Sequence, residues 1–258
     1  MEEHVRTMET ITLDQMGAVK LMNRVDQKFM TNKATLPLLL DRIAPYYYVQ
    51  RIDGVAVADY RTLYFDTSDL AMYTCHHNRK RRRQKLRIRT YRSTQTTFFE
   101  LKNKDNKGKT HKTRIPVDVS LFDKALQQPQ VSAFVAENTP YPVESLLEQV
   151  ENAFSRLTLV DKAMTERVTI DYNIRFHNRH TGIDKDISDL VIIEVKHEVG
   201  APKSVIEEAL LELRVHPKRV SKYCIGTVLT NPAAKYNRFK IKIRLIEKLI
   251  EASQQNKE

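Results

Sequence analysis

Glycine and cysteine are scarce in this sequence, and it has no long hydrophobic run. Only six glycines occur among 258 residues, which argues against a glycine-rich linker between two domains. The two cysteines, Cys75 and Cys224, lie far apart in no metal-ligand spacing, so we expect reduced thiols in a cytoplasmic protein. The apolar runs 36–40 and 190–195 are too short to cross a bilayer, so we expect no transmembrane segment.

Acidic residues are outnumbered as well. The chain has 43 lysines and arginines against 32 aspartates and glutamates, which gives a formal net charge of +11. A charge of this sign indicates a polyanionic partner, and nucleic acid, an anionic membrane and a phosphate-rich small molecule all fit that description. Composition alone leaves these three open.

Alternation of polar and apolar residues with a period of two predicts that strands dominate the fold. We predict strands at 24–30, 55–65, 85–91, 97–103, 112–117, 167–175 and 190–197, with a shorter eighth at 46–52. Helical spacing predicts helices at 35–44, 143–154, 204–213 and 239–250. Strands joined by short turns, with helices in between, predict an antiparallel α+β fold.

The stretch 127–142 contains three prolines and scattered polar residues, and we predict a loop there instead of a domain boundary. Residues 1–258 are therefore expected to form one domain. Its core would span about 23–230, and a C-terminal helix would span about 237–252.

One face of nearly every predicted strand is basic. In the strand 85–91, Lys85, Arg87 and Arg89 share a face, because successive side chains on a strand point to opposite sides. Cations side by side on neighbouring strands repel each other, so an anion is needed to offset the repulsion. The basic residues in such positions are Arg24, Lys28, Lys85, Arg87, Arg89, Lys102, Lys104, Lys112, Arg114, Arg167 and Lys196, and the acidic ones are Asp26, Glu100, Glu194 and Glu198.

Two arrangements accommodate this pattern: an open basic sheet lying on nucleic acid, or a sheet closed on itself with the charges inside. About eight strands close into a barrel whose interior holds side chains or one small ligand. A protein that binds a nucleic-acid backbone gains nothing from carboxylates among its cations. A metal–triphosphate site needs a few of them as hard oxygen ligands for Mn²⁺ or Mg²⁺. We therefore predict an eight-stranded antiparallel β-barrel tunnel with helices packed outside, and no nucleic-acid partner.

Several short motifs follow one another along the chain. They are Arg24-Val-Asp26-Gln-Lys28-Phe29, Leu63-Tyr64-Phe65-Asp66-Thr67, Lys85-Leu-Arg87-Ile-Arg89-Thr-Tyr91, Glu100-Leu-Lys102, Arg167-Val-Thr-Ile-Asp171, Ile192-Ile-Glu194-Val-Lys196 and Ser221-Lys222-Tyr223. In this order they resemble the VTC domain, the catalytic domain of the vacuolar transporter chaperone polyphosphate polymerase, which belongs to the triphosphate tunnel metalloenzymes. Each motif alone is weak, and the ordered set is fairly specific.

The resemblance implies roles for individual residues. Those that match triphosphate-gripping positions of the family are Lys28, Arg87, Arg89, Lys102, Arg167 and Lys222. Glu194 matches the principal metal-binding carboxylate, and Asp26 takes the second acidic position of an ExExK pattern whose first glutamate is Arg24 here. Glu100 is left with two interpretations, a salt bridge inside the tunnel and a metal ligand. Further phosphate contacts are expected from Arg24, Lys85, Lys104, Lys112, Arg114, Lys196 and Ser221.

The resemblance also implies an activity, the metal-dependent transfer of a nucleoside triphosphate's γ-phosphate to a polyphosphate chain, with ATP as the expected nucleotide. With water as the attacking group, the same tunnel would be a triphosphatase. A non-catalytic module that binds polyanions is a third possibility. One departure stands out: the Tyr-x-Arg motif expected shortly before the Arg167 strand is replaced by Asp161-Lys162-Ala163, so Lys162 is only a weak substitute.

Overall fold

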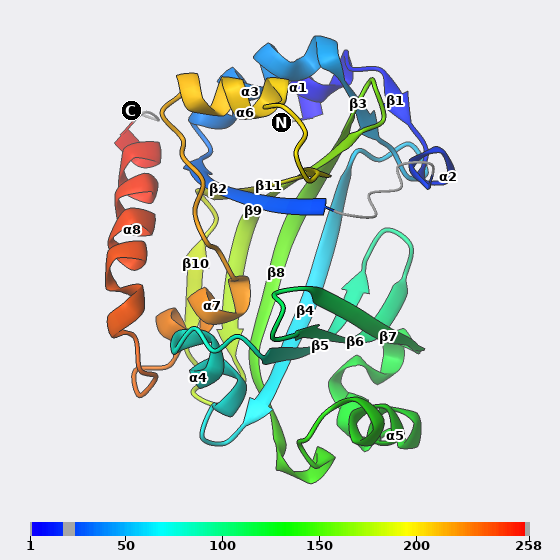
Figure 1. Cartoon of the computed structure of the whole chain (residues 1–258), viewed down its shortest axis with the longest axis vertical. Helices are drawn as coiled ribbons and strands as arrows, with labels where there is room; N and C mark the ends of the chain where they lie inside the picture. The colour runs from blue at the N-terminus through cyan, green and yellow to red at the C-terminus, as the bar shows by residue number, and fades with distance from the viewer. Residues whose placement is uncertain (1, 18–23, 256–258) are drawn as a thin grey trace.

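An eleven-stranded sheet forms the centre of the molecule in the computed structural model, which describes residues 2–17 and 24–255 (Figure 1). Eight strands form one antiparallel path in the order β2 (Arg24–Asn32), β11 (Leu190–Glu198), β9 (Glu166–Asn178), β8 (Leu146–Asp161), β4 (Val57–Thr67), β5 (Arg83–Tyr91), β6 (Thr96–Lys104) and β7 (Thr110–Val117). Three short strands flank this path: β1 (Thr10–Ile11), β3 (Tyr47–Gln50) and β10 (Asp184–Ile187).

Helices connect and cover the strands. The α-helices are α1 (Glu2–Arg6), α2 (Leu13–Met16), α3 (Thr35–Ile43), α4 (Ala71–His77), α5 (Pro129–Asn138), α6 (Val205–Glu212), α7 (Lys222–Thr230) and α8 (Lys240–Gln255). The 3₁₀ segments are η1 (Ala44–Tyr46), η2 (Val119–Gln127), η3 (Val143–Ser145) and η4 (Asn237–Phe239). In the described part of the chain, no helix combines the length and apolar character needed to cross a membrane.

The predicted strands and three of the four predicted helices are present, and the α+β class with a large antiparallel sheet is confirmed. The predicted helix at 143–154 is wrong, because most of this stretch begins β8. That strand runs between β4 and β9 in the middle of the sheet, so apolar residues are buried on both of its faces and their spacing imitates a helix. The predicted loop at 127–142 is also wrong over α5, where Pro129 occupies the first turn, a position that needs no backbone N–H.

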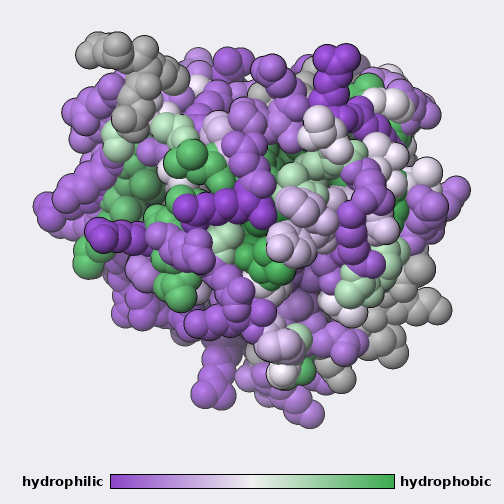
Figure 2. Space-filling view, turned by 90° about the horizontal axis from the view of Figure 1, so that it is seen from above, coloured by the Kyte–Doolittle hydropathy of each residue, from purple (hydrophilic) through white to green (hydrophobic). Residues whose placement is uncertain are grey.

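The outer face of the sheet is apolar and lies under helices, as predicted. α3 and α6 pack over β11 and β9, where Ile193 and Leu210 belong to one buried cluster. η2 and α5 pack over β5 and β6, where Ile88 and Phe134 belong to another. Seen from above, hydrophilic side chains cover most of the remaining surface, with hydrophobic residues in small patches between them (Figure 2).

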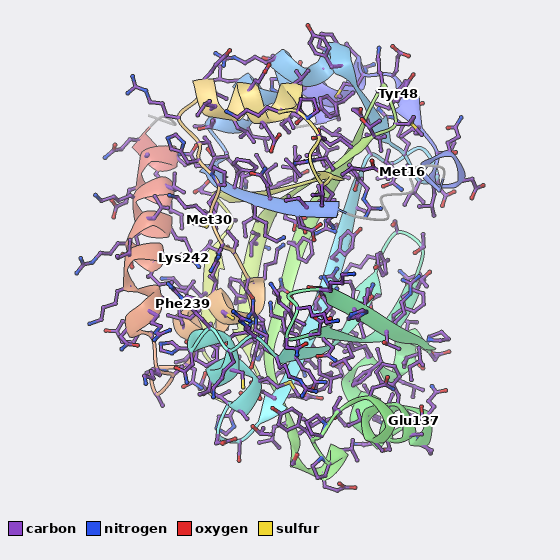
Figure 3. The ribbon with its side chains drawn as sticks, in the orientation of Figure 1. Met16, Met30, Tyr48, Glu137, Phe239 and Lys242 are labelled. Atoms are coloured by element: carbon purple, nitrogen blue, oxygen red, sulfur yellow. The ribbon has the colours of Figure 1, made fainter. Side chains whose placement is uncertain are left out.

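The inner face is covered at one end by the last two helices. Met30 of β2 lies beside α8 (Figure 3) and shares a buried cluster with Ile225 of α7 and Ile246 of α8. Met30 points to the same side of the strand as Lys28, because side chains two residues apart share a face. α7 and α8 therefore lie on the side of β2 that also carries the predicted charged residues.

The ends of the strand path do not join. β2 and β7 terminate it, and no hydrogen-bonded pairing between them is present among the described residues. The sheet is bent instead of flat, and the register shifts between Leu63 and Phe65 and between Ala153 and Ser155, where irregular pairing increases the local bend. The sheet is thus open, and the predicted closed barrel of eight strands is not confirmed.

Candidate functional site

The strands β5, β6 and β7 carry the first half of the site. In the ladder between β5 and β6, Lys85 pairs with Lys102 and Arg87 pairs with Glu100. In the next ladder Lys102 pairs with Lys112, so these side chains share the inner face of the sheet. The same face continues through Arg89, Lys104 and Arg114.

The strands β2, β11 and β9 carry the second half. Lys28 pairs with Glu194, and Lys196 pairs both with Asp26 and with Arg167. Arg24 is in register with Glu198, but its side chain lies outside the described residues. We call the two halves together the charged face; it comprises Asp26, Lys28, Lys85, Arg87, Arg89, Glu100, Lys102, Lys104, Lys112, Arg114, Arg156, Arg167, Asp171, Glu194 and Lys196.

Bending of the sheet brings the two halves of the charged face toward each other. β6 and β11 are five steps apart in the strand order, which would separate them by about 24 Å in a flat sheet. Arg87 and burial lower the pKa of Lys102 well below its usual value, yet Glu194 on β11 raises this pKa and Lys196 lowers it. Charges influence each other strongly only at short range, so Lys102 and Glu194 lie closer together than a flat sheet would allow.

The first turn of α7 closes the site from one side. Ser221 caps this helix by accepting a hydrogen bond from the backbone N–H of Cys224, and Lys85 Nζ donates to the same Ser221 oxygen at 2.9 Å. The next residue, Lys222, donates to Asp171 of β9. The Ser221-Lys222 pair therefore links β5 to β9, which are separated by β4 and β8 in the sheet.

Glu194 lies among cations. Lys28 Nζ donates to its Oε1 at 2.7 Å, and Lys196 Nζ lies 3.4 Å from the same oxygen. Burial alone would raise the pKa of Glu194, but Lys196 and Lys28 outweigh burial and hold this pKa well below the usual range. The carboxylate is therefore anionic at neutral pH.

Glu100 is fully buried in the opposite half. Arg87 donates to its Oε2 from Nε at 2.8 Å and from Nη2 at 2.6 Å, and Lys112 forms an ion pair with Oε1. Burial opposes ionisation of Glu100, but Arg87, Arg89 and Lys112 lower its pKa to about 2. Of the two interpretations that the sequence left open for Glu100, the salt bridge inside the site is the one that the geometry displays.

Arg156 and Asp171 form an ion pair that the sequence analysis did not single out. Arg156 Nε lies 2.6 Å from Asp171 Oδ1, and its Nη2 lies 2.8 Å from Oδ2, so the pair is bidentate. The segment Phe154-Ser155-Arg156 places an arginine shortly before the Arg167 strand, as the family's Tyr-x-Arg motif does, with phenylalanine in the tyrosine position. Lys162 instead pairs with Glu9 at the surface, so it is not the substitute.

Among the cations of the charged face that the structure describes, Arg89 and Lys102 lie beside Arg87 and lack an acidic partner. Arg89 donates from Nε to Thr62 Oγ1 at 3.0 Å, and burial together with Arg87 lowers its pKa. Within the described part of the chain, no carboxylate lies within ion-pair distance of Arg89 or Lys102. Buried charges without counterions are unfavourable, so an anionic ligand beside these two residues would stabilise the site.

A divalent metal ion bound at the charged face would need some of its coordinating oxygen atoms from a bound phosphate compound. The residues that the structure describes contain no group of three or more His, Cys, Asp and Glu side chains that could hold a metal alone. Glu194 and Asp26 lie on neighbouring strands two residues apart in register, and Glu194 uses Oε1 for Lys28. Mg²⁺ is commonly bound by one or two carboxylates together with substrate phosphates, and the donor set fits that mode.

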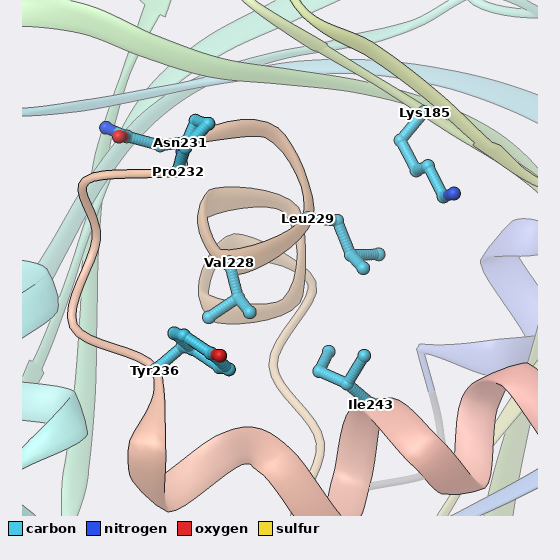
Figure 4. A pocket seen from close by; sticks show the side chains of 7 residues that line it. All are labelled: Lys185, Val228, Leu229, Asn231, Pro232, Tyr236 and Ile243. Atoms are coloured by element: carbon cyan, nitrogen blue, oxygen red, sulfur yellow. The ribbon is translucent and has the colours of Figure 1, made fainter.

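A separate hollow of about 220 Å³ lies between α7 and α8 (Figure 4). Val228, Leu229, Tyr236 and Ile243 contribute apolar walls, and Lys185 is the cation among its lining residues. One lysine cannot offset the charge of a triphosphate. This hollow is therefore a poor candidate for the anion site.

The fold is similar to that of a putative adenylate cyclase from Bacillus halodurans, with a TM-score of 0.50 and 17% identity, over 78% of this chain and 94% of that one. A putative adenylyl cyclase from Hippeastrum, described as having a dominant triphosphatase activity, matches with a TM-score of 0.48 and 14% identity, over 82% of this chain and 98% of that one. No curated protein sequence gives a match.

Residues 23–231 match the family model of the VTC domain, and the chain belongs to this family. The resemblance inferred from the ordered motifs is thereby confirmed.

Proposed function

We propose that this chain is a polyphosphate polymerase that transfers the γ-phosphate of a nucleoside triphosphate, ATP in the first instance, to a polyphosphate chain. The observation that carries the proposal is the pair of cations Arg89, which is buried, and Lys102, which is half-buried; both lie beside Arg87, and the described residues provide no acidic partner for either. Membership of the VTC family supports it. A triphosphate carries enough negative charge to offset several of these cations at once.

The proposed phosphate contacts are the cations that line the two halves of the charged face. Arg87, Arg89 and Lys102 bind the triphosphate from one half, and Lys28, Arg167 and Arg156 bind it from the other. Lys222 reaches the face from α7. Weaker contacts come from Arg24, Lys85, Lys104, Lys112, Arg114, Lys196 and Ser221. On this proposal the eight strands of the path enclose a tunnel around the ligand.

Glu194 and Asp26 are the proposed ligands for Mn²⁺ or Mg²⁺. When bound, such an ion supplies positive charge to the phosphate oxygens of the ligand. Glu100 is assigned a different task, because both of its oxygens already contact cations: it holds Arg87 and Lys112 in place. Phosphoryl transfer depends mainly on positioning and charge stabilisation, and these residues can provide both.

Transfer to polyphosphate makes little demand on the base strength of the carboxylates in the charged face. Glu100 and Asp171 have pKa values of about 2, and the pKa of Glu194 is also lowered, so all three are weak bases. The terminal oxygen of a polyphosphate chain is already anionic and needs no base. A water molecule has to lose a proton during attack and gains little help from such carboxylates.

Phosphorus NMR after incubation of the protein with ATP and Mn²⁺ tests the proposal. We expect ADP together with the resonances of internal phosphates in a polymer. ADP with only orthophosphate would identify a triphosphatase. No consumption of any nucleotide with either metal would leave a module that binds polyanions.

We also propose that residues 1–258 act as one domain in the cytoplasm, where ATP is abundant.

A further inference from the structure

One end of the charged face is aromatic. Along the inner side of β5 the residues are Lys85, Arg87, Arg89 and then Tyr91, and Arg89 pairs across the ladder with Phe98 of β6. The rings of Tyr91 and Phe98 meet edge to face, with centroids 6.2 Å apart and planes at 86°. The row of cations therefore ends at a pair of rings.

These two rings keep part of their surface open to solvent. Tyr91 and Phe98 are half-buried, whereas Phe99, the neighbour of Phe98, is fully buried in the core on the outer face. Phe98 points to the inner side, away from that core cluster, which does not include it. A partly exposed phenylalanine among cations contributes little to the core, so a ligand that covers it is a reasonable explanation of its position.

A planar, delocalised group already lies against this ring. The guanidinium carbon of Arg114 is 4.0 Å from the centroid of Phe98. A nucleobase has the same flat shape, and it can displace the Arg114 side chain or lie beside it. Deeper in the face, Tyr60 and Phe154 stack on each other 5.0 Å apart, but both are buried and leave no ring surface for a ligand.

We infer that Tyr91 and Phe98 form the platform for the base of the nucleoside triphosphate. This rests on the proposed function, and it gives the site a direction. The base lies at the Tyr91 end, the phosphate nearest the ribose lies at Arg89, and the terminal phosphate lies toward Lys102 and Glu194. Aromatic platforms bind every base, since each has a π-face, so the site accepts more than one nucleotide.

Two ligands measured on one variant test the platform. In Phe98→Ala we expect the dissociation constant for ATP, measured by calorimetry without metal, to rise roughly ten-fold, as loss of one stacked base does. The dissociation constant for inorganic tripolyphosphate should stay within about two-fold, because it has no base. Phe98→Tyr keeps an aromatic ring at this position, so this variant should bind ATP as the unaltered protein does. Tyr236→Ala, which removes an exposed aromatic ring outside the charged face, should change neither constant.

Equal weakening of ATP and tripolyphosphate in Phe98→Ala would mean that the ring only supports the phosphate site, and it would overturn the inference. Unchanged ATP binding would place the base elsewhere and would overturn it too. Failure of the proposed function is read separately, from the products in the phosphorus NMR experiment, because a triphosphatase or a module that binds polyanions would still bind both ligands.

Discussion

Tyr223 donates its hydroxyl hydrogen to Asp66, and this buried pair joins α7 to β4. Asp66 also accepts from the backbone N–H groups of Met72 and Tyr73, each at 2.8 Å, so its position is fixed by α4. The ring of Tyr223 stacks on Tyr64, with centroids 5.0 Å apart. Because Tyr223 follows Lys222 directly, the pair determines where Lys222 enters the charged face.

Removal of this one hydroxyl group should affect binding more than stability. We expect Tyr223→Phe to lower the unfolding free energy by about 1 kcal/mol, the net value of one hydrogen bond. The affinity for tripolyphosphate should fall several-fold, because Lys222 is no longer held in its position. Tyr73→Phe is the matched control, because its hydroxyl donates to the carbonyl of Lys235 at 2.7 Å in the same aromatic cluster. Calorimetry and thermal unfolding provide both readouts. Equal loss of affinity in the two variants would contradict a positioning role for Tyr223.

Replacement of Glu194 separates binding from chemistry. Glu194→Gln keeps the shape of the side chain and removes its charge, so turnover should fall by at least roughly two orders of magnitude. Binding of tripolyphosphate without metal should persist or tighten, because a negative charge leaves the site. Glu198→Gln, at the exposed end of the same strand, is the control and should retain activity. Turnover close to that of the unaltered protein in Glu194→Gln would rule out the assigned metal role.

Two neighbouring arginines should have opposite effects on the ligand-free protein. Arg89→Ala removes a buried cation that has no acidic partner, so the thermal midpoint should stay level or rise. Arg87→Ala leaves Glu100 buried with Lys112 as its remaining ion-pair partner, so the midpoint should fall. Thermal unfolding without ligand gives this comparison. A lower midpoint in Arg89→Ala as well would show that its hydrogen bond to Thr62 and its contacts with the Tyr60 and Phe154 rings outweigh the cost of the unpaired charge.

The binding of tripolyphosphate and of RNA by Arg89→Ala distinguishes a closed site from an open basic surface. Arg89→Ala should weaken the binding of tripolyphosphate by about 1.5–3 kcal/mol, the value of a buried charge-assisted contact. The affinity for RNA should stay unchanged. An open nucleic-acid surface predicts the reverse, with lower RNA affinity and a salt dependence shallower by about one unit. Binding measured over a salt series for both ligands decides between them.

Stability should depend on acid pH through Glu100. Its folded pKa is about 2, below the ordinary 4.5, so its ionisation stabilises the folded state above pH 4.5 and that contribution is lost as pH falls toward 2. The difference in unfolding free energy between the unaltered protein and Glu100→Gln should therefore shrink over this range. Glu137→Gln, an exposed change on α5 (Figure 3), should show a constant difference. A constant difference for Glu100→Gln would show that the ion pairs with Arg87 and Lys112 are not stabilising.

The strand pattern was readable because each strand at the charged face has one polar and one apolar side. β5 shows this, with Arg87 and Arg89 inside and Ile88 in the outer core. β8 could not be recognised in the same way, because a strand buried from both sides has no alternation and its spacing matches a helix. Closure of the sheet could not be judged from pattern at all, since it depends on whether two distant strands, β2 and β7, pair.

The sequence predicted which charged residues share one face of the sheet, and it missed one arginine because a strand was taken for a helix. Lys28, Arg87, Lys102 and Glu194 lie on one face, as their alternation required. Arg156 was overlooked because the helix predicted at 143–154 ended just before it. A strand through Phe154-Ser155-Arg156 would have placed this arginine on the inner face.

Among the described residues β7 pairs on one side only, with β6, and this free edge bears on how copies of the chain meet. An unpaired strand edge can add a strand from another molecule, and lysine or proline on that edge hinders such pairing. β7 carries Lys112, Arg114 and Pro116, and its first five residues are exposed. Two copies that paired through β7 would bring these cations together. Lys112 and Arg114, which are proposed to contact phosphate, thus also disfavour pairing between copies through this edge.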